Sequence, residues 1–293
     1  MFEAFDEGGG PGASHHKVVE QGRREVGSTE GITGRIARSV VAGMAFRDVL
    51  KHVHLRENRG DAHAPIDLRR LNERLLCVLI ACHQLDTARR RLMGSMNAQQ
   101  TLKDAAHLLM ARVDGGHSRL PEQLKLEAML ADLRRSVEDA TEMWARAGRY
   151  FTRVTRLLPA QLDANEGGFV PVAPTEVDRL ALEAQRVGDA FLQDSEWYSP
   201  PVGDRFARAR QTYLQAVMDW ESAQAGWVSA GRARQQAEIG FRVGPRGVLE
   251  FAQAVVSQDW QRGSFLSREA HACMKRHALY AAALQLPAHL GLR

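Results

Sequence analysis

The chain has 293 residues, of which 44% are hydrophobic and 25% are charged, with a formal net charge of +4. This composition excludes a disordered chain. The 39 basic residues are spread along the sequence and form no stripe, so nucleic-acid binding is not expected. No run of about 18 apolar residues occurs, so the sequence predicts no helix that spans a bilayer.

The N-terminal segment, residues 1–30, is polar and glycine-rich, and we expect it to be flexible. Its acidic start lacks the basic and apolar parts of a secretory signal, so the literal sequence start predicts a cytoplasmic protein. Ser28 is placed to cap a first helix over 29–56. A break at 57–65 follows.

A long helix is predicted from Pro65 onwards, because apolar residues recur in alternating steps of four and three. One polar exception, Arg89, interrupts the row, and the phase shifts before Leu102. Such a shift is a stutter, which locally unwinds a supercoil without ending the helix. The row consists of Leu71, Leu75, Val78, Cys82, Leu85, Arg89, Leu92 and Met96, and it resumes with Leu102, Ala106, Leu109 and Val113.

The next helix is more regular, since apolar residues fill all ten core positions of a heptad pattern. A helix over 126–158 would be about 50 Å long, which is typical of a coiled coil. The ten residues are Leu126, Leu130, Leu133, Val137, Ala140, Trp144, Ala147, Phe151, Val154 and Leu158.

A proline- and glycine-rich connection at 159–176 leads to a short helix over 176–193 and a second break. Large rings and alanines then alternate along a heptad seam, and we expect them to pack in a core instead of holding a cofactor or lipid. The rings are Phe206, Tyr213, Trp220 and Trp227; the alanines are Ala209, Ala216, Ala223, Ala230 and Ala237. A last helix after Gly244 carries Leu266, Ala270, Cys273, His277, Tyr280 and Leu284 on one face and is predicted to stop at Pro287.

No segment alternates convincingly as a half-buried strand, so the sequence predicts an all-α fold of two long helical hairpins in tandem. Nucleotide-binding loops and the motifs of covalent catalysis are absent, which leaves no basis for an enzyme or a cofactor. A metal site is not expected either, because the histidines lack partners at ligand spacing. They include His83, His107, His117, His271 and His277.

Two turns in this pattern are alike: "ARVDGG" at 111–116 and "FRVGPRG" at 241–247. The first precedes "EQLKLEAMLADLR" and "FTRVTRLLPAQL"; the second precedes "VLEFAQA" and "HALYAAALQLPAHLGL". These stretches resemble the two repeats of TolC-type outer-membrane efflux proteins, and most closely those that serve type I secretion. The resemblance covers roughly 97–162 and 205–292.

The resemblance implies long antiparallel coiled-coil hairpins and a homotrimer that forms a periplasmic tunnel. It further implies an outer-membrane location and a passive role in export, with the helical turns docked to a periplasmic adaptor that is coupled to an inner-membrane pump. Glycine in such turns permits positive φ, and an acidic residue complements the dipole of the following helix. Carried across, the docking tips are Arg112, Val113, Gly115, Gly116 and Glu122, and Phe241, Arg242, Val243, Gly244, Arg246 and Glu250.

Each repeat of that family also inserts an extended β-hairpin that builds a membrane barrel. The corresponding places, 51–66 and 192–204, do not alternate, so we expect the helical part of the fold without these strands. The alternative reading is a soluble coiled-coil scaffold without transport activity. The predicted organisation is a flexible segment (1–30), a first repeat (31–162, tip near 113–121), a connector (163–204) and a second repeat (205–293, tip near 243–247).

Overall fold

The computed structural model describes residues 44–57, 68–114, 120–163, 168–192, 202–243 and 247–292, all within one unit of the chain. Regular structure in these ranges is helical apart from one isolated bridge, which confirms the predicted all-α fold. The helices are α2 (Phe46–Glu57), α3 (Leu68–Asp114), α4 (Leu120–Thr155), the 3-10 turn η1 (Pro159–Gln161), α5 (Pro174–Leu192), α6 (Val202–Val243), α7 (Val248–Ala282) and α8 (Leu286–His289).

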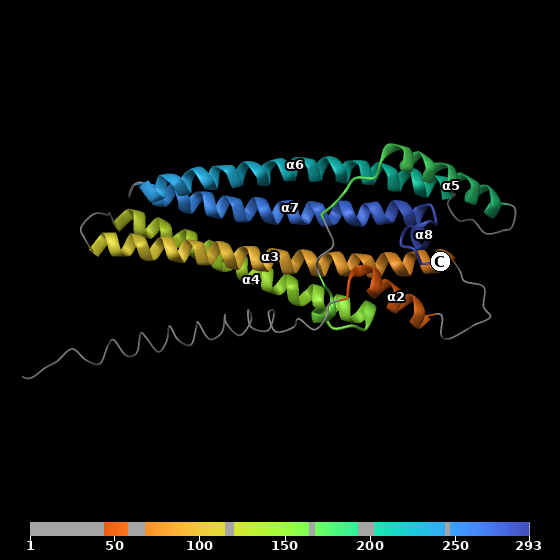
Figure 1. The fold of residues 1–293 in the computed structure, drawn as a ribbon, viewed down its shortest axis with the longest axis horizontal. Coiled ribbons are helices and arrows are strands. Elements are labelled where there is room, and N and C mark those ends of the chain that lie inside the picture. Colours follow the sequence, from red (N-terminus) through yellow and green to blue (C-terminus); the bar gives the residue numbers. More distant parts are fainter. Residues whose placement is uncertain are drawn as a thin grey trace, which may run out of the picture. The chain divides into compact units, whose positions relative to one another are not determined.

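Two antiparallel hairpins make up most of this unit, α3 with α4 and α6 with α7 (Figure 1). Helix α3 also packs against α7, so the four long helices follow the order α4, α3, α7, α6. With 47 and 42 residues, α3 and α6 are about 70 and 63 Å long at 1.5 Å per residue. The short helices α2 and α8 contact α3, and α5 contacts α6. We call the end opposite the two interhelical turns the base.

The heptad predicted for α4 is confirmed over most of its length, with Leu126, Leu133 and Phe151 fully buried. The prediction was wrong for the last residue of the row, because α4 ends at Thr155 and the side chain of Leu158 is 63% exposed. Arg156 adopts a φ of 63°, which turns the backbone out of the helix. The hydroxyl of Thr155 then accepts a hydrogen bond from the Leu157 amide at 3.1 Å and closes this end.

The aromatic row of α6 packs in the core as expected. Phe206 and Tyr213 are buried, and the half-buried Trp227 stacks on Phe265 of α7 with 4.7 Å between ring centroids. The Tyr213 hydroxyl accepts a hydrogen bond from the Val172 amide at 2.7 Å. The ring row therefore joins α6 both to α7 and to the segment before α5.

Helix α3 runs without interruption through the predicted stutter. It is buried on a wider face than one heptad seam provides, because it packs against both α4 and α7. The extra buried positions include polar side chains, among them Asn72, His83, Asp86 and Ser95. The polar exception in the predicted row, Arg89, is half-buried.

The other helix ends differ from the predictions in detail. The described part of the first predicted helix is α2, so residues 51–57 are helical; residues 29–43 lie outside the described ranges. The last long helix ends at Ala282, earlier than predicted, because Leu284 has a φ of 56°. Pro287 then lies within the short helix α8, where a proline is tolerated because the first-turn amides have no helical partners.

Candidate functional site

The first predicted tip is described only in part. Arg112 and Val113 belong to the last turn of α3, while Gly115 and Gly116 lie outside the described residues. Glu122 is half-buried in the first turn of α4. There its carboxylate complements the positive end of the helix dipole.

The second predicted tip has the same construction. Phe241 is buried near the end of α6, and the neighbouring Arg242 pairs with Glu238 at 2.5 Å on the surface. Val243 ends the helix, and Glu250 stands exposed in the first turn of α7. Gly244 and Arg246 lie outside the described residues.

A single apolar cluster, which we call the tip cluster, joins the two hairpins just behind their turns. Phe241 of α6 stacks on Phe251 of α7 with ring centroids 5.1 Å apart and nearly parallel planes. The other hairpin contributes Leu102 of α3 and Leu126 of α4 to the same cluster. Its buried members are Ala98, Leu102, Ala105, Leu126, Leu133, Phe241, Val248, Phe251, Ala252 and Val255. The structure thus brings the ends of both hairpins together, although their turns are about 130 residues apart in sequence.

A row of polar contacts, which the heptad pattern did not predict, joins α3 to α7 and α8. We call this row the polar seam. From the base towards the tips its contacts are Leu286 N to Asn72 Oδ1 (3.1 Å), His83 Nε2 to His277 Nε2 (3.1 Å), Arg90 Nη1 to Glu269 Oε2 (2.5 Å) and Ser95 Oγ to Asp259 Oδ1 (3.0 Å). Residue numbers rise on α3 as they fall on α7 and α8, as an antiparallel pair requires.

The acidic side chains of the polar seam have hydroxyl or guanidinium groups as neighbours. The Asp259 carboxylate, which is 9% exposed, accepts hydrogen bonds from Ser95 and from Ser136 of α4. Arg90 lies between two acidic side chains, Glu269 and, at 3.7 Å, Asp86. Burial raises the pKa of Asp86 to about 6, against the opposing effect of Arg90.

The histidine pair in the polar seam is electrically neutral at neutral pH. Burial, with a further contribution from Arg276, lowers the pKa of His83 to about 4. Burial also holds the pKa of His277 well below its ordinary value. At 3.1 Å one Nε2 must carry the hydrogen and the other must accept it, which two imidazolium rings cannot do. His277 stood in the predicted apolar row, but no sequence signal identified a partner 194 residues away.

Two glycines leave room for arginine side chains between α3 and α7 beside these contacts. A methyl group at Gly263 would collide with the Arg91 guanidinium, and one at Gly94 would collide with that of Arg262. Each helix therefore provides a glycine over which an arginine of the other helix lies.

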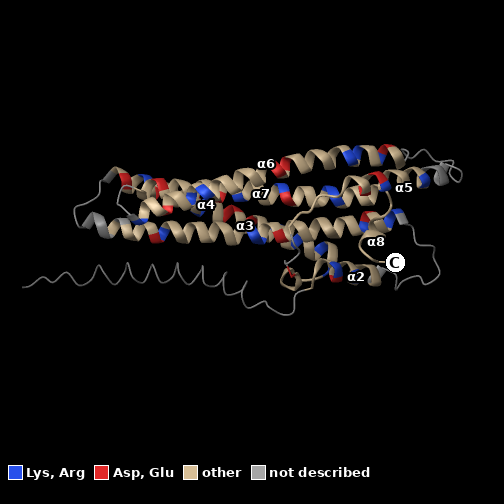
Figure 2. Cartoon of the chain, turned by 45° about the horizontal axis from the view of Figure 1, so that its top comes forward, with Lys and Arg blue, Asp and Glu red and all other residues tan. Residues whose placement is uncertain are grey.

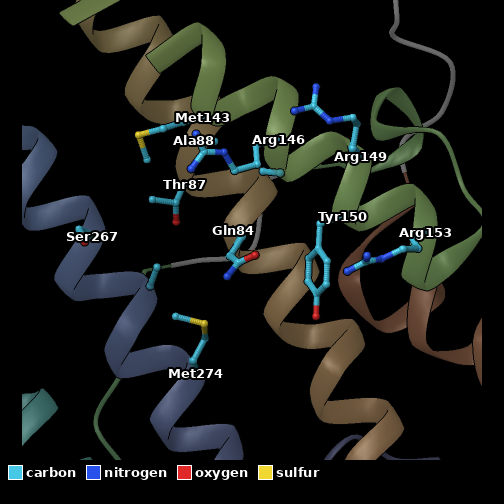
Figure 3. A pocket seen from close by; sticks show the side chains of 12 residues that line it. Gln84, Thr87, Ala88, Met143, Arg146, Arg149, Tyr150, Arg153, Ser267 and Met274 are labelled. Carbon is cyan, nitrogen blue, oxygen red and sulfur yellow. The ribbon is translucent and has the colours of Figure 1, made fainter. Parts of the chain in front are cut away.

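A groove with a volume of about 730 Å³ runs between α4 and α7 over α3 (Figure 3). Its apolar wall includes Met143 and Tyr150 of α4 and Met274 of α7. Its lining residues are Gln84, Thr87, Ala88, Met143, Arg146, Ala147, Arg149, Tyr150, Arg153, Ser267, Ala270 and Met274, with three cations and no acidic side chain. The groove can hold an apolar side chain beside an anionic group.

Basic and acidic residues are interspersed along the described helices (Figure 2). Three or more metal-ligating side chains do not come together anywhere among the described residues. A search of the same residues finds no helix with the length and apolar character needed to cross a membrane.

Comparison with known proteins reveals similarity in fold. No protein-family model matches the sequence, and no curated protein matches it. The outer-membrane channel OprN is similar in structure with a TM-score of 0.55 and 16% identity, over 80% of this chain and 69% of that one. A membrane protein from Pseudomonas aeruginosa has a TM-score of 0.55 and 12% identity, over 81% and 71% of the two chains. The two-hairpin array is therefore similar in fold to an outer-membrane channel and to a further membrane protein; at these identities the similarity concerns the fold alone.

Proposed function

We propose that this chain is a TolC-type export-channel component, or a truncated relative of one, that acts at the outer membrane as a passive tunnel. Its repeats would be 31–162 and 205–293, joined by the connector 163–204. In this role the helical turns dock to a periplasmic adaptor that is coupled to an inner-membrane pump. The fold similarity to the outer-membrane channel OprN supports the proposal.

The observation that carries the proposal is the tip cluster. The helices that flank two turns of similar sequence share one apolar cluster, and each turn is followed by a glutamate in the first turn of the next helix. A scaffold that binds through its helix faces does not require its two turns to be held together. A docking end does, because one partner must contact both turns at once.

The proposed assembly is a homotrimer in which the two outer helices meet those of neighbouring copies. On α4 the groove beside Met143 is open, and α6 exposes Leu214 and Met218. Each of these side chains is more than 40% exposed, although both helices bury another face within their hairpins. Apolar side chains on unpaired helix faces favour association.

Site-specific photocrosslinking in the native cells tests the docking proposal. A photoreactive residue replaces Gln236, which is exposed close to the second turn, or Gln211, which is exposed towards the base end of the same helix. We expect Gln236 to give an adduct with a protein that mass spectrometry identifies as an adaptor with its own helical hairpin. Gln211 should give no such adduct.

Equal adducts at both positions, or none at the tip, would count against docking and favour the scaffold. Sedimentation of the purified chain tests the trimer separately. If the chain stays monomeric at all concentrations, the homotrimer is excluded, and the result on docking is unaffected.

A further inference from the structure

A second cavity, far from the tip cluster along α3, lies at the base between α2, α3, α7 and α8. Its volume is about 310 Å³. Apolar side chains, Phe46, Leu50 and Leu79 among them, form part of its wall. The remaining wall is basic or potentially basic, with Arg47, His277 and His289, and no acidic side chain lines it.

The Arg47 guanidinium lies beside the turn that follows α8. Gly291 has a φ of +66°, and a Cβ there would lie 2.7 Å from Arg47 Nη2. The guanidinium thus lies against backbone that only glycine accommodates easily. A guanidinium offers a planar set of donors that fits a carboxylate or phosphate.

The two lining histidines are fixed by their neighbours. The His289 ring stacks on Tyr280 with centroids 3.7 Å apart, and the Tyr280 hydroxyl lies 3.3 Å from the Glu176 carboxylate. His277 is bound to His83 through Nε2, and its buried Nδ1 has no hydrogen-bond partner among the described residues. When His277 carries hydrogens on both nitrogens, Nε2 donates to His83 and Nδ1 is free to donate elsewhere.

The charges around these rings oppose their protonation. The titratable and charged groups that face them are Arg47 of α2, His83 of α3, Glu176 of α5 and Arg276 and Tyr280 of α7. Burial first, and then Arg276, lowers the pKa of His289; Glu176 acts in the opposite direction. An anion in the cavity would offset this positive potential, so its binding and histidine protonation would favour each other.

We propose that the base cavity binds a small organic anion, with its oxyanion group at Arg47 and His289 and its short apolar body against Phe46, Leu50 and Leu79. Binding takes up a proton on the histidine cluster. The proposal is independent of docking at the tips, since none of these residues belongs to the tip cluster.

Calorimetric titration of the intact protein with hexanoate tests the proposal near pH 7, where this probe keeps its charge. We expect saturable binding that is weaker for acetate, which lacks the apolar body, and undetectable for hexylamine, which has the opposite charge. Affinity should rise several-fold between about pH 8 and about pH 6. Heats measured in buffers of different ionisation enthalpy should reveal proton uptake.

Two matched substitutions locate the binding. Arg47→Gln should weaken hexanoate about tenfold or more, because it removes a charged hydrogen-bond donor. Arg149 is an exposed arginine of α4 that lines the other groove, so Arg149→Gln should leave the affinity for hexanoate unchanged. Hexyl phosphate in place of hexanoate tells whether a phosphate or a carboxylate group is preferred.

Four outcomes would overturn the proposal: no saturable binding of either hexyl anion, equal binding of hexylamine, loss on Arg149→Gln in place of Arg47→Gln, or affinity and heats independent of pH and buffer. Circular dichroism of both variants establishes that they are folded. Since Arg47 is exposed, its replacement should not disturb the helices.

Discussion

The helices within each hairpin and the two hairpins themselves are joined by different chemistry. Within hairpins apolar packing dominates the buried contacts, as between Phe151 of α4 and its neighbours or between Trp227 and Phe265, and polar pairs such as Arg268 with Asp219 lie nearer the surface. Between hairpins, the apolar tip cluster lies behind the turns, and α3 and α7 also meet through the polar seam, in which hydroxyls, carboxylates, imidazoles and a guanidinium pair in register.

The two kinds of contact contribute differently to stability and to the alignment of the helices. Apolar contacts are non-directional and stabilise a hairpin in proportion to the surface they bury. Polar contacts between buried groups add little net stability over an apolar pair. Any register that leaves such a group unpaired is destabilised, because a buried polar group without a partner is costly. The apolar seams therefore provide most of the stability, and we infer that the polar seam fixes how the hairpins are aligned.

The largest effect is expected from truncation in an apolar seam. Phe151 is fully buried, so Phe151→Ala should lower the free energy of unfolding by about 3–5 kcal/mol, through lost burial and the cavity left behind. Urea denaturation followed by circular dichroism measures the change. Trp260→Ala is the matched control, because Trp260 is 67% exposed and its loss should cost less than about 0.5 kcal/mol. A loss below about 1 kcal/mol for Phe151→Ala would contradict the assignment of stability to the apolar seams.

A smaller loss is expected when one partner of the polar seam is removed. Arg90→Ala leaves the buried Glu269 carboxylate unpaired and should cost about 2–3 kcal/mol, since Arg90 is itself partly solvated. In the Asp86→Asn background, where no second carboxyl loses Arg90, the double variant Arg90→Met, Glu269→Leu removes both charges and should recover to within about 1 kcal/mol of that background. Urea denaturation of the parent, the background, and the single and double variants completes the comparison. If the double variant is as unstable as the single one, the pair contributes net stability and the proposed division of roles is wrong.

Acid should loosen the polar seam gradually. His83 and His277 have folded pKa values below the ordinary value, so the unfolded chain takes up their protons first as the pH falls below about 6.5, and stability declines towards pH 4. Asp86 acts in the opposite sense, because its raised pKa of about 6 lets the folded state bind a proton first. From these three groups alone, two protons against one leave a net decline of about 1.4 kcal/mol per pH unit. The lowered pKa values of His271 and His289 add to the decline.

Asp86→Asn isolates the two contributions. Without the opposing carboxyl, the unfolding free energy should fall more steeply between about pH 6 and pH 5. The slope should increase by roughly 1.4 kcal/mol per pH unit, which corresponds to about one proton. Denaturant titrations at closely spaced pH values measure both slopes. Identical slopes for the parent and the variant would show that Asp86 does not titrate in this range.

Heptad spacing was sufficient to predict the apolar seams, since it depends only on local helical geometry. It placed Leu133 and Phe151 of α4, and Phe206 and Tyr213 of α6, at buried positions. It could not predict the polar seam, because nothing local marks Ser95 as the partner of Asp259 or His83 as that of His277. It also missed the end of α4, where the conformation of Arg156 overrides an apolar pattern that continues to Leu158.

The smallest effect on stability is expected at the exposed glutamate of the second tip. Glu250 is exposed and interacts favourably with the dipole at the start of α7, so Glu250→Gln should cost only about 0.3–1 kcal/mol. Glu221→Gln, on an exposed position in the middle of α6, should cost less still. Because the dipole effect is screened, the difference between the two variants should shrink as salt is added to the denaturation buffer. Glu250→Gln could instead lower the free energy of unfolding by more than Arg90→Ala does. The turn would then stabilise the hairpin as strongly as the seams do, which would assign the tip a structural role.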